Sequence, residues 1–305
     1  MLKPHGIWFA ALVASIASQG CNRVAKDIAY DPAGTDSLTT LDIYPPRLGR
    51  HHPVVVFIHG GSYVGGDKST EVGGKPKAFA GEGYVFVAIN YRLSPAVKHP
   101  AHIQAVAKAI AWVYHNIGRY GGDSTRLFVL GHSSGASMAA LIATNERYLK
   151  AEGLDLSSLS GAILLDGSAY DVPRRFSDDS VEAHRLLAIF GDDPAAWEDV
   201  SAIYHCHKDK GIPPFLIFFL TARASGTQQS QALAGALAAA GVSVEIKPIQ
   251  TVGHYKLNLE LGLETDPATA DVFAFLKRGR DTGSIRLARD TSTGGSPGAA
   301  AATPQ

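Results

Sequence analysis

One stretch of the 305-residue sequence combines a candidate nucleophile with the glycines that would expose it. Ser133 lies at the centre of Gly131-His132-Ser133-Ser134-Gly135, a Gly-x-Ser-x-Gly pattern. In this pattern a sharp turn lifts the serine above the end of a sheet, and the glycines keep side chains out of the crossing. An exposed hydroxyl can attack an acyl carbonyl once a neighbouring base removes its proton. The pattern therefore predicts a serine nucleophile at position 133, with no side-chain role for His132 or Ser134.

The residues around this turn predict the elements that it requires. Leu127 to Leu130 are apolar and predict a buried strand, and the small residues from Ala136 to Leu149 predict a helix. A chain with 32 glycines can contain Gly-x-Ser-x-Gly by chance. A chance match has no reason to lie between a strand and a helix, so the context favours a nucleophile turn.

A second glycine-rich turn can bind the negative charge that acyl transfer creates. Gly60, Gly61 and Ser62 follow the apolar run Val54 to Ile58. Backbone N–H groups of such a turn can donate to an oxyanion because no Cβ shields them. We expect the oxyanion donors to be the N–H groups near Gly60 and Gly61, together with that of Ser134. Taken alone, this segment also fits a plain tight turn.

The candidate base is His254, although the chain contains 12 histidines. His254 lies just after the last predicted strand, Val242 to Ile249, where a loop can carry the imidazole back over Ser133. Its position also fits the chain order of nucleophile, acid and histidine that accompanies a Gly-x-Ser-x-Gly turn.

Predicted strands and helices alternate along most of the chain, which indicates a mostly parallel sheet covered by helices on both faces. Antiparallel edge strands are expected between Asp27 and Tyr44. The other predicted strands are Val54 to Ile58, Tyr84 to Ile89, Leu127 to Leu130, Ala162 to Leu165, Phe215 to Leu220 and Val242 to Ile249, and the helices are Ile103 to Ile117, Ala136 to Leu149, Gln228 to Ala240 and Ala268 to Lys277.

Composition limits the classes of function. With 46% hydrophobic and 18% charged residues, the chain can form one α/β domain. Its formal net charge is zero and it has no basic cluster, which argues against nucleic-acid binding. Cys21 and Cys206 are the only cysteines in the sequence, so a disulfide framework and a multi-cysteine zinc site are excluded. No metal or organic cofactor is expected.

Both ends of the chain differ in composition from the domain, which we place at residues 27–278. Residues 1–21 combine Lys3 with the apolar run Ile7 to Ala17, as an export signal does. The segment ends in Ser18-Gln19-Gly20-Cys21, similar to a bacterial lipoprotein cleavage box, which predicts lipidation of Cys21 and a periplasmic or membrane-anchored protein. An ordinary signal peptide leading to secretion, or an incidental cysteine, are the alternatives. Residues 279–305 are rich in Ser, Thr, Gly, Ala and Pro and are expected to be disordered.

The alternation of strands and helices breaks between residues 170 and 211. This charged segment contains Asp178-Asp179, Asp192-Asp193 and Trp197. We interpret it as an insertion over the strand ends that forms a lid or one wall of a pocket, with a plain surface excursion as the alternative.

Five motifs in order give the chain a family resemblance over residues 30–278. Together they resemble the α/β-hydrolase esterases and lipases, in the branch of hormone-sensitive-lipase-like carboxylesterases and the related deacetylase and feruloyl-esterase-like proteins. The resemblance implies an α/β-hydrolase fold and a serine hydrolase acting on a small ester, with structural roles for Asp67, Arg92 and Asp123. The motifs are His59-Gly60-Gly61 with Gly66-Asp67-Lys68, Asn90-Tyr91-Arg92-Leu93-Ser94-Pro95, Gly121-Gly122-Asp123, Gly131-His132-Ser133-Ser134-Gly135-Ala136 and Gly253-His254.

The chain departs from this family at the acid that orients the histidine. The family usually carries that aspartate after the strand that is Phe215 to Leu220 here, and this sequence has Arg223 in its place. No Asp or Glu occurs between Lys210 and Glu245. The acid therefore comes from another strand, or the protein works with a Ser-His dyad, or it is no longer a hydrolase.

Asp166 is the best replacement acid, because it directly follows the predicted strand Ala162 to Leu165 and would share the sheet edge with Ser133. A loop-capping role without catalysis is the alternative. Asp171 lies further along the loop and ranks second, and Glu245 lies too early, inside its strand. We expect a serine carboxylester hydrolase; an aryl-formamidase-like amide hydrolase or a catalytically impaired binding protein are the alternatives.

Overall fold

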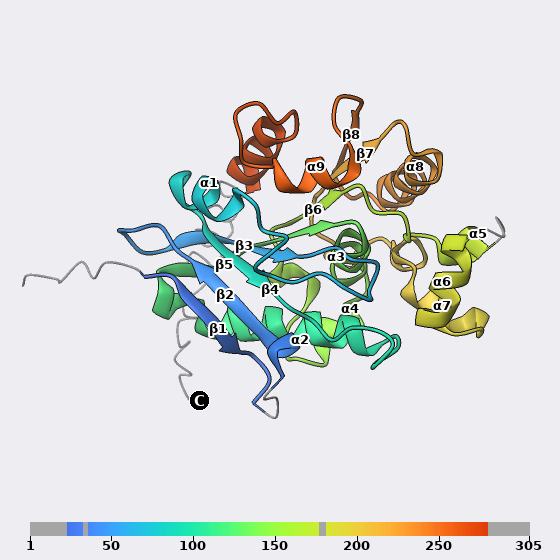
Figure 1. Cartoon of the computed structure of the whole chain (residues 1–305), viewed down its shortest axis with the longest axis horizontal. Helices are drawn as coiled ribbons and strands as arrows, with labels where there is room; N and C mark the ends of the chain where they lie inside the picture. The colour runs from blue at the N-terminus through green and yellow to red at the C-terminus, as the bar shows by residue number, and fades with distance from the viewer. Residues whose placement is uncertain (1–22, 33–35, 177–180, 280–305) are drawn as a thin grey trace, which may run out of the picture.

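Eight strands form a single sheet in the order β1-β2-β4-β3-β5-β6-β7-β8 (Figure 1). The computed structural model describes residues 23–32, 36–176 and 181–279. The expected export signal with Cys21, and nearly all of the expected disordered tail, lie outside these residues. The strands are β1 Ala25–Ala29, β2 Thr40–Tyr44, β3 His52–Ile58, β4 Val85–Ile89, β5 Gly122–His132, β6 Gly161–Leu165, β7 Phe215–Leu220 and β8 Val244–Ile249.

The direction of the strands matches the prediction of a mostly parallel sheet. β1 pairs antiparallel with β2, and β2 pairs antiparallel with β4. All pairs from β4 to β8 are parallel. Parallel strands require crossover connections, and helices provide most of these here. The carboxyl ends of β5, β6 and β7 consequently meet at one edge of the sheet, where the predicted site residues lie.

Helices cover both faces of the sheet. In the view of Figure 1, α1, α9 and a helix over residues 269–279 lie above the sheet, and α2 and α4 lie below it. α5, α6 and α7 form a separate group at the right edge of the view. The helices are α1 Lys75–Gly81, α2 Ala101–Asn116, α3 Ser134–Thr144, α4 Glu146–Lys150, α5 Val172–Phe176, α6 Val181–Phe190, α7 Pro194–Val200, α8 Ala224–Ala239 and α9 His254–Leu259.

Two apolar layers form the core, one on each face of the sheet. In β3, Val54, Val56 and Ile58 belong to the layer with α2, α3 and α8. Val55 and Phe57 belong to the opposite layer, with α1, α9 and the helix over residues 269–279. All five side chains are fully buried. A strand that is apolar on both faces in this way is typical of the centre of a parallel sheet.

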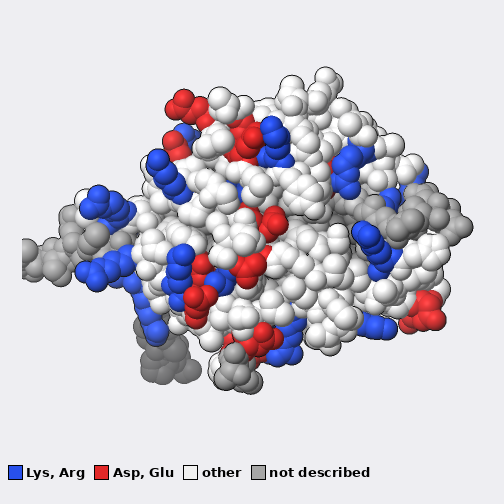
Figure 2. Space-filling view, viewed as in Figure 1, with Lys and Arg blue, Asp and Glu red and all other residues white. Residues whose placement is uncertain are grey.

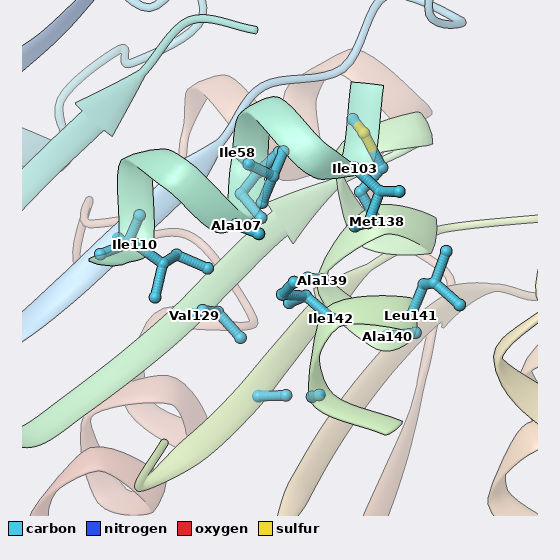
Figure 3. Packing of buried hydrophobic residues seen from close by; sticks show 14 of the residues in the cluster. Ile58, Ile103, Ala107, Ile110, Val129, Met138, Ala139, Ala140, Leu141 and Ile142 are labelled. Carbon is cyan, nitrogen blue, oxygen red and sulfur yellow. The ribbon is translucent and has the colours of Figure 1, made fainter. Parts of the chain in front are cut away.

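The helix that follows the nucleophile turn is the most deeply enclosed helix of this layer. Every residue of α3 is buried. Figure 3 shows Met138, Ala139 and Ile142 of α3 close to Ile103 of α2 and to Val129 of β5. A helix that is buried all round is held in place by packing on several sides. The backbone N–H groups at its start therefore have a fixed position.

The structure corrects one prediction about this region. The sequence predicted one helix from Ala136 to Leu149, but α3 ends at Thr144 and α4 begins at Glu146. Asn145 separates them with φ −96° and ψ 98°, and its side chain accepts a hydrogen bond from the Arg147 N–H. Asparagine favours such a cap because its short side chain competes with the helical backbone for hydrogen bonds.

The described surface carries charges of both signs. Figure 2 shows Lys and Arg side chains mixed with Asp and Glu on the face in view, with uncharged surface between them. Within the described ranges, no helix is both long enough and apolar enough to span a bilayer.

Candidate active site

Ser133 lies in a strained turn directly after β5. Its backbone angles are φ 55° and ψ −120°, a conformation that residues other than glycine rarely adopt. The flanking glycines are required by space: a Cβ at Gly131 would lie 2.2 Å from the Gly135 carbonyl oxygen, and one at Gly135 would lie 2.1 Å from that of Ile58. The Ser133 N–H donates to the Leu165 carbonyl at 2.9 Å, which ties the turn to β6. The strand, turn and helix thus have the predicted arrangement.

Asp166 and His254 are in direct contact. Asp166 is the first residue after β6, is 0% exposed, and has a positive φ of 49°. Its Oδ2 lies 2.6 Å from Nδ1 of His254, and its Oδ1 accepts the Leu220 N–H at 3.1 Å. Two acceptors would repel at 2.6 Å, so Nδ1 carries a proton, and in the neutral ring Nε2 then keeps its lone pair. This is the tautomer in which Nε2 can accept a proton.

Arg223 joins this pair. Its Nη1 lies 2.5 Å from Oδ2 of Asp166, 3.3 Å from the Asp166 carbonyl oxygen and 3.0 Å from Nδ1 of His254. Burial opposes ionisation of Asp166, but the hydrogen bond from His254 and the charge of Arg223 outweigh burial and hold the pKa of Asp166 below its ordinary value. The sequence identified Arg223 only as the residue that replaces the usual acid.

Two further side chains hold the backbone that carries His254. His254 is the first residue of α9, and its carbonyl oxygen lies 3.0 Å from Nε2 of His132. Burial, followed by the charge of His254, lowers the pKa of His132 to about 3, so His132 is neutral and donates this bond. At the other end of α9, Nζ of the buried Lys75 donates to the Asn258 carbonyl at 2.6 Å. No pattern in the sequence predicted a role for either side chain.

The glycine turn after β3 packs against the nucleophile. A Cβ at Gly60 would lie 3.2 Å from Cβ of Ser133. The Tyr91 hydroxyl donates to the carbonyl oxygens of His59 and Gly60, at 3.0 and 3.2 Å. Both carbonyl oxygens are thus held by a buried hydroxyl.

Two N–H groups beside Ser133 are available to an anion. Among the residues that the structure describes, none accepts a hydrogen bond from the N–H group of Gly61 or of Ser134. Ser134 is the first residue of α3, where backbone N–H groups lack partners within the helix. Of the three predicted donors, Gly61 thus lies in the turn after β3, and Ser134 lies at the start of a helix, where the helix dipole favours negative charge.

A cavity of about 260 Å³ opens above Ser133. Its lining includes Ser62 and Tyr63 of the glycine turn, and Leu186 and Ile189 of α6. α6 belongs to the segment over residues 170–211, which we interpreted from the sequence as an insertion. The remaining lining residues are Ser134, Ser137, Ser168, Ala169 and Arg185.

Other acidic residues weighed from the sequence lie elsewhere. The Asp171 carboxylate accepts the Arg174 N–H at 3.3 Å, at the start of α5. Glu245 lies within β8 and pairs with Arg278. In the part of the chain that the structure describes, no group of three or more His, Cys, Asp or Glu residues is placed to hold a metal ion.

Two residues read as structural from the family motifs brace loops. Asp67 accepts from Asn90 at 2.8 Å and from the Ser69 N–H at 2.7 Å. Asp123 pairs with Arg126 at 2.9 Å. His254 is not among the partners in these bonds.

Comparison with known proteins places these features in a family. The sequence profile of the BD-FAE family matches residues 41–237. Esterase LipC of Mycobacterium tuberculosis is 29% identical over 195 residues, which are 60% of this chain and 48% of that protein. Kynurenine formamidase of Meyerozyma guilliermondii is 36% identical over 147 residues, which are 46% of this chain and 52% of that protein. The chain spans about half or less of the length of the curated relatives that it matches first.

Solved structures show the same fold. Esterase B from Lactobacillus rhamnosis matches with a TM-score of 0.70 and 22% identity, over 88% of both chains. Esterase 2 of Thermogutta terrifontis, phosphonylated by sarin, matches with a TM-score of 0.66 and 23% identity, over 85% of this chain and 93% of the other. The predicted α/β-hydrolase fold is confirmed.

Proposed function

The chain belongs to the BD-FAE family, and on that premise we propose that it is a serine carboxylester hydrolase that acts on small esters through an acyl-enzyme. The observation that carries this proposal is the contact of Asp166 Oδ2 with His254 Nδ1 at 2.6 Å, on the sheet edge where Ser133 holds its strained turn. Relatives named as esterases, and a structure of esterase B inhibited by a tributyrin phosphonate, support the same chemistry.

In the acylation step, Nε2 of His254 takes the proton of the Ser133 hydroxyl while Oγ forms a bond to the ester carbonyl carbon. The carbonyl oxygen becomes an oxyanion, which accepts hydrogen bonds from the N–H groups of Gly61 and Ser134, with Gly60 close by. Asp166 stabilises the imidazolium through the Nδ1–H bond. The tetrahedral intermediate then breaks its bond to the alkoxy oxygen, and the alcohol leaves with the proton from Nε2.

Deacylation repeats these roles with water as the nucleophile. Nε2 takes a proton from water, the hydroxyl oxygen bonds to the acyl carbon, and a second oxyanion forms in the same place. The bond to Ser133 Oγ then breaks, and the serine recovers its proton from Nε2. The products are the free acid and an enzyme in its starting state, and no metal or cofactor takes part.

The cavity sets the size of the ester. A volume of about 260 Å³ next to Ser133 suits a short acyl chain. α6, from the segment interpreted as a lid or one wall, forms a wall beside this acyl chain, because Leu186 and Ile189 line the cavity that contains Ser133. Exchange of these two side chains should therefore alter the preferred chain length.

Two alternatives remain testable beside the esterase. Amide hydrolysis uses the same nucleophile and oxyanion donors, and the matched kynurenine formamidase is the observation that favours it. A catalytically impaired binding protein was suggested by Arg223 at the usual acid position. The contact between Asp166 and His254 argues against impairment, since it supplies the carboxylate from β6.

We further propose that the protein is exported from a bacterial cytoplasm and carries a lipid anchor at Cys21. The basis is the sequence of residues 1–21 alone. Cleavage at a nearby position without lipidation would give a periplasmic or secreted protein instead.

Turnover of p-nitrophenyl acetate and p-nitrophenyl butyrate tests the main proposal. Hydrolysis of either ester by the purified wild-type protein is expected, and an N-formyl aryl amide measured beside them separates the ester from the amide assignment. Absence of turnover on all three substrates, in folded protein, would leave the binding-protein alternative.

A further inference from the structure

Arg223 adds a positive charge to the pair formed by Asp166 and His254. Its Nη1 and the His254 Nδ1 both contact the same carboxylate oxygen, Oδ2 of Asp166, at 2.5 and 2.6 Å. The two nitrogens are 3.0 Å apart. The shared oxygen therefore holds a permanent cation beside the ring that must become a cation during acyl transfer.

Asp166, and not Arg223, determines which ring nitrogen of His254 carries the proton. If Nδ1 accepted the Arg223 N–H, the ring proton would sit on Nε2, and Nε2 could not take a proton from Ser133. The short contact to Asp166 requires a hydrogen on Nδ1 instead. Arg223 consequently donates to Oδ2 and to the Asp166 carbonyl oxygen, at 2.5 and 3.3 Å, and holds the carboxylate in line with the ring.

We propose that Arg223 is a positioning residue that orients Asp166 and lowers the pH range in which His254 can act as a base. This inference rests on the proposed esterase function. A carboxylate alone beside the imidazole would favour the protonated ring and restrict activity to higher pH. The guanidinium opposes that effect of the carboxylate, because it places a charge of opposite sign beside the same ring.

The other charged or titratable groups near His254 do not replace this effect. From β5, His132 faces the ring at a centroid distance of 4.5 Å, and its lowered pKa of about 3 keeps it neutral. Asp166, directly after β6, contacts the ring at Nδ1. On α9 itself, Tyr255 contacts the ring edge-on at 5.6 Å, and Lys256 is exposed and pairs with Glu260. Among these groups Arg223 is the cation within hydrogen-bonding distance of the ring.

Burial explains why the charge has a measurable effect. Asp166 is fully buried, and the side chains of Arg223 and His254 are 28% and 23% exposed. Water screens such groups less than it screens surface ion pairs. The lowered pKa of Asp166 agrees with this arrangement, since Arg223 contributes to keeping the carboxylate ionised.

The test is the pH profile of kcat/KM for p-nitrophenyl butyrate in the wild type and in Arg223→Gln. We expect the midpoint of the acid limb to move to higher pH by about 1–2 units in Arg223→Gln, because the removed cation lay next to the ring. Arg223→Lys keeps the charge, so its midpoint should stay within about half a unit of the wild type even if its plateau falls. Arg126→Gln is the matched control, because Arg126 pairs with Asp123 away from the site.

The outcomes separate this inference from the proposed function. If the wild type and Arg223→Gln are both active and their acid limbs have the same midpoint, the inference is overturned and the proposed esterase function stands. An ion pair with only a structural role would change the melting temperature and leave that midpoint unchanged. Wild-type protein without turnover on any substrate would overturn both. If Arg223→Gln does not fold, Arg223→Met, which keeps the apolar stem, is measured in its place with the same expected displacement.

Discussion

Oδ2 of Asp166 lies 2.6 Å from Nδ1 of His254, across 88 positions of sequence. The acid of this pair comes from the end of β6, one strand away from the nucleophile strand β5, and not from the loop after β7. Both residues reach the same sheet edge because the strands between them are parallel. In the proposed triad, Asp166 therefore takes the place of an acid at position 223.

Replacement of Ser133 by alanine tests the nucleophile. A fluorophosphonate probe should label the wild type, and Ser133→Ala should lose both labelling and at least about 10⁴ in kcat, because the attacking oxygen is removed. In-gel fluorescence and ester turnover measure the two effects. Ser137→Ala is a suitable control, since Ser137 lines the same cavity; labelling that survives in Ser133→Ala would contradict the assignment.

Asp166→Asn tests the acid. We expect kcat to fall by roughly 10²–10⁴ with little change in KM, because the amide no longer stabilises the imidazolium. Asp171→Asn is the matched control on the same loop and should be nearly silent in kcat. Steady-state kinetics at the pH optimum of each variant decide the matter, and a fully active Asp166→Asn protein would favour a Ser133-His254 dyad.

Neighbouring glycines allow a sharp test of the oxyanion turn. A Cβ at Gly66 would lie 2.4 Å from the Gly60 carbonyl oxygen, at a backbone φ of 93°. At Gly65 the nearest atom would be 3.9 Å away. Gly66→Ala should therefore displace the turn and lower kcat by roughly 10²–10³, the range for a lost oxyanion donor, while Gly65→Ala should retain near wild-type kcat. Equal kinetics in the two variants would argue that the turn does not bind the oxyanion.

Buried Lys75 should give stability a distinct pH dependence. Burial lowers its pKa from 10.5 to about 7, so between these values the unfolded chain holds a proton that the folded protein releases. Stability should then rise with pH in this window, by at most about 1.4 kcal/mol per pH unit relative to Lys75→Met. Urea unfolding at pH 7, 8 and 9 measures the slope. Lys77→Met, on the exposed side of α1, should run parallel to the wild type, and a parallel Lys75→Met curve would refute the prediction.

Cys21→Ser tests the proposed anchor. Acyl chains on Cys21 would hold the protein at a membrane, so the variant should move from the membrane fraction to the soluble fraction of a bacterial host. Fractionation and mass spectrometry of the mature N-terminus check this. Identical partitioning of both proteins, with a mature N-terminus other than position 21, would indicate simple secretion.

The sheet was predictable because each central strand is a short apolar run that ends in a recognisable turn. The strand Phe215 to Leu220 has the predicted boundaries, and the apolar run before Asp166 gave the position of β6 to within one residue. Of the edge strands, β2 lies within the expected segment, whereas β1 begins at Ala25, two residues before it. Local patterns determine these elements, since the burial of both faces leaves few alternatives.

Side-chain contacts across the fold were less predictable. Whether Arg223 folds back onto Asp166 depends on the path of the chain after β7, which no local pattern encodes. Lys75 reaches Asn258 across 183 positions, and nothing in its neighbourhood marks it as buried. The catalytic roles of Ser133, His254 and Asp166 stay predictions until the variants above are measured.

Pairing of β5 with β6 fixes one part of the proposed site, whereas the part that carries His254 lies on a short helix outside the sheet. Ser133 and Asp166 each follow the last residue of their strand, and His132 faces Leu165 in the register. Hydrogen bonds from the Ser133 N–H to Leu165 and from the Asp166 N–H to Phe218 extend the sheet through both residues. His254 instead depends on a six-residue helix held at its two ends. Local opening of α9 would therefore inactivate the protein while the sheet stays folded, and closure alone would restore activity.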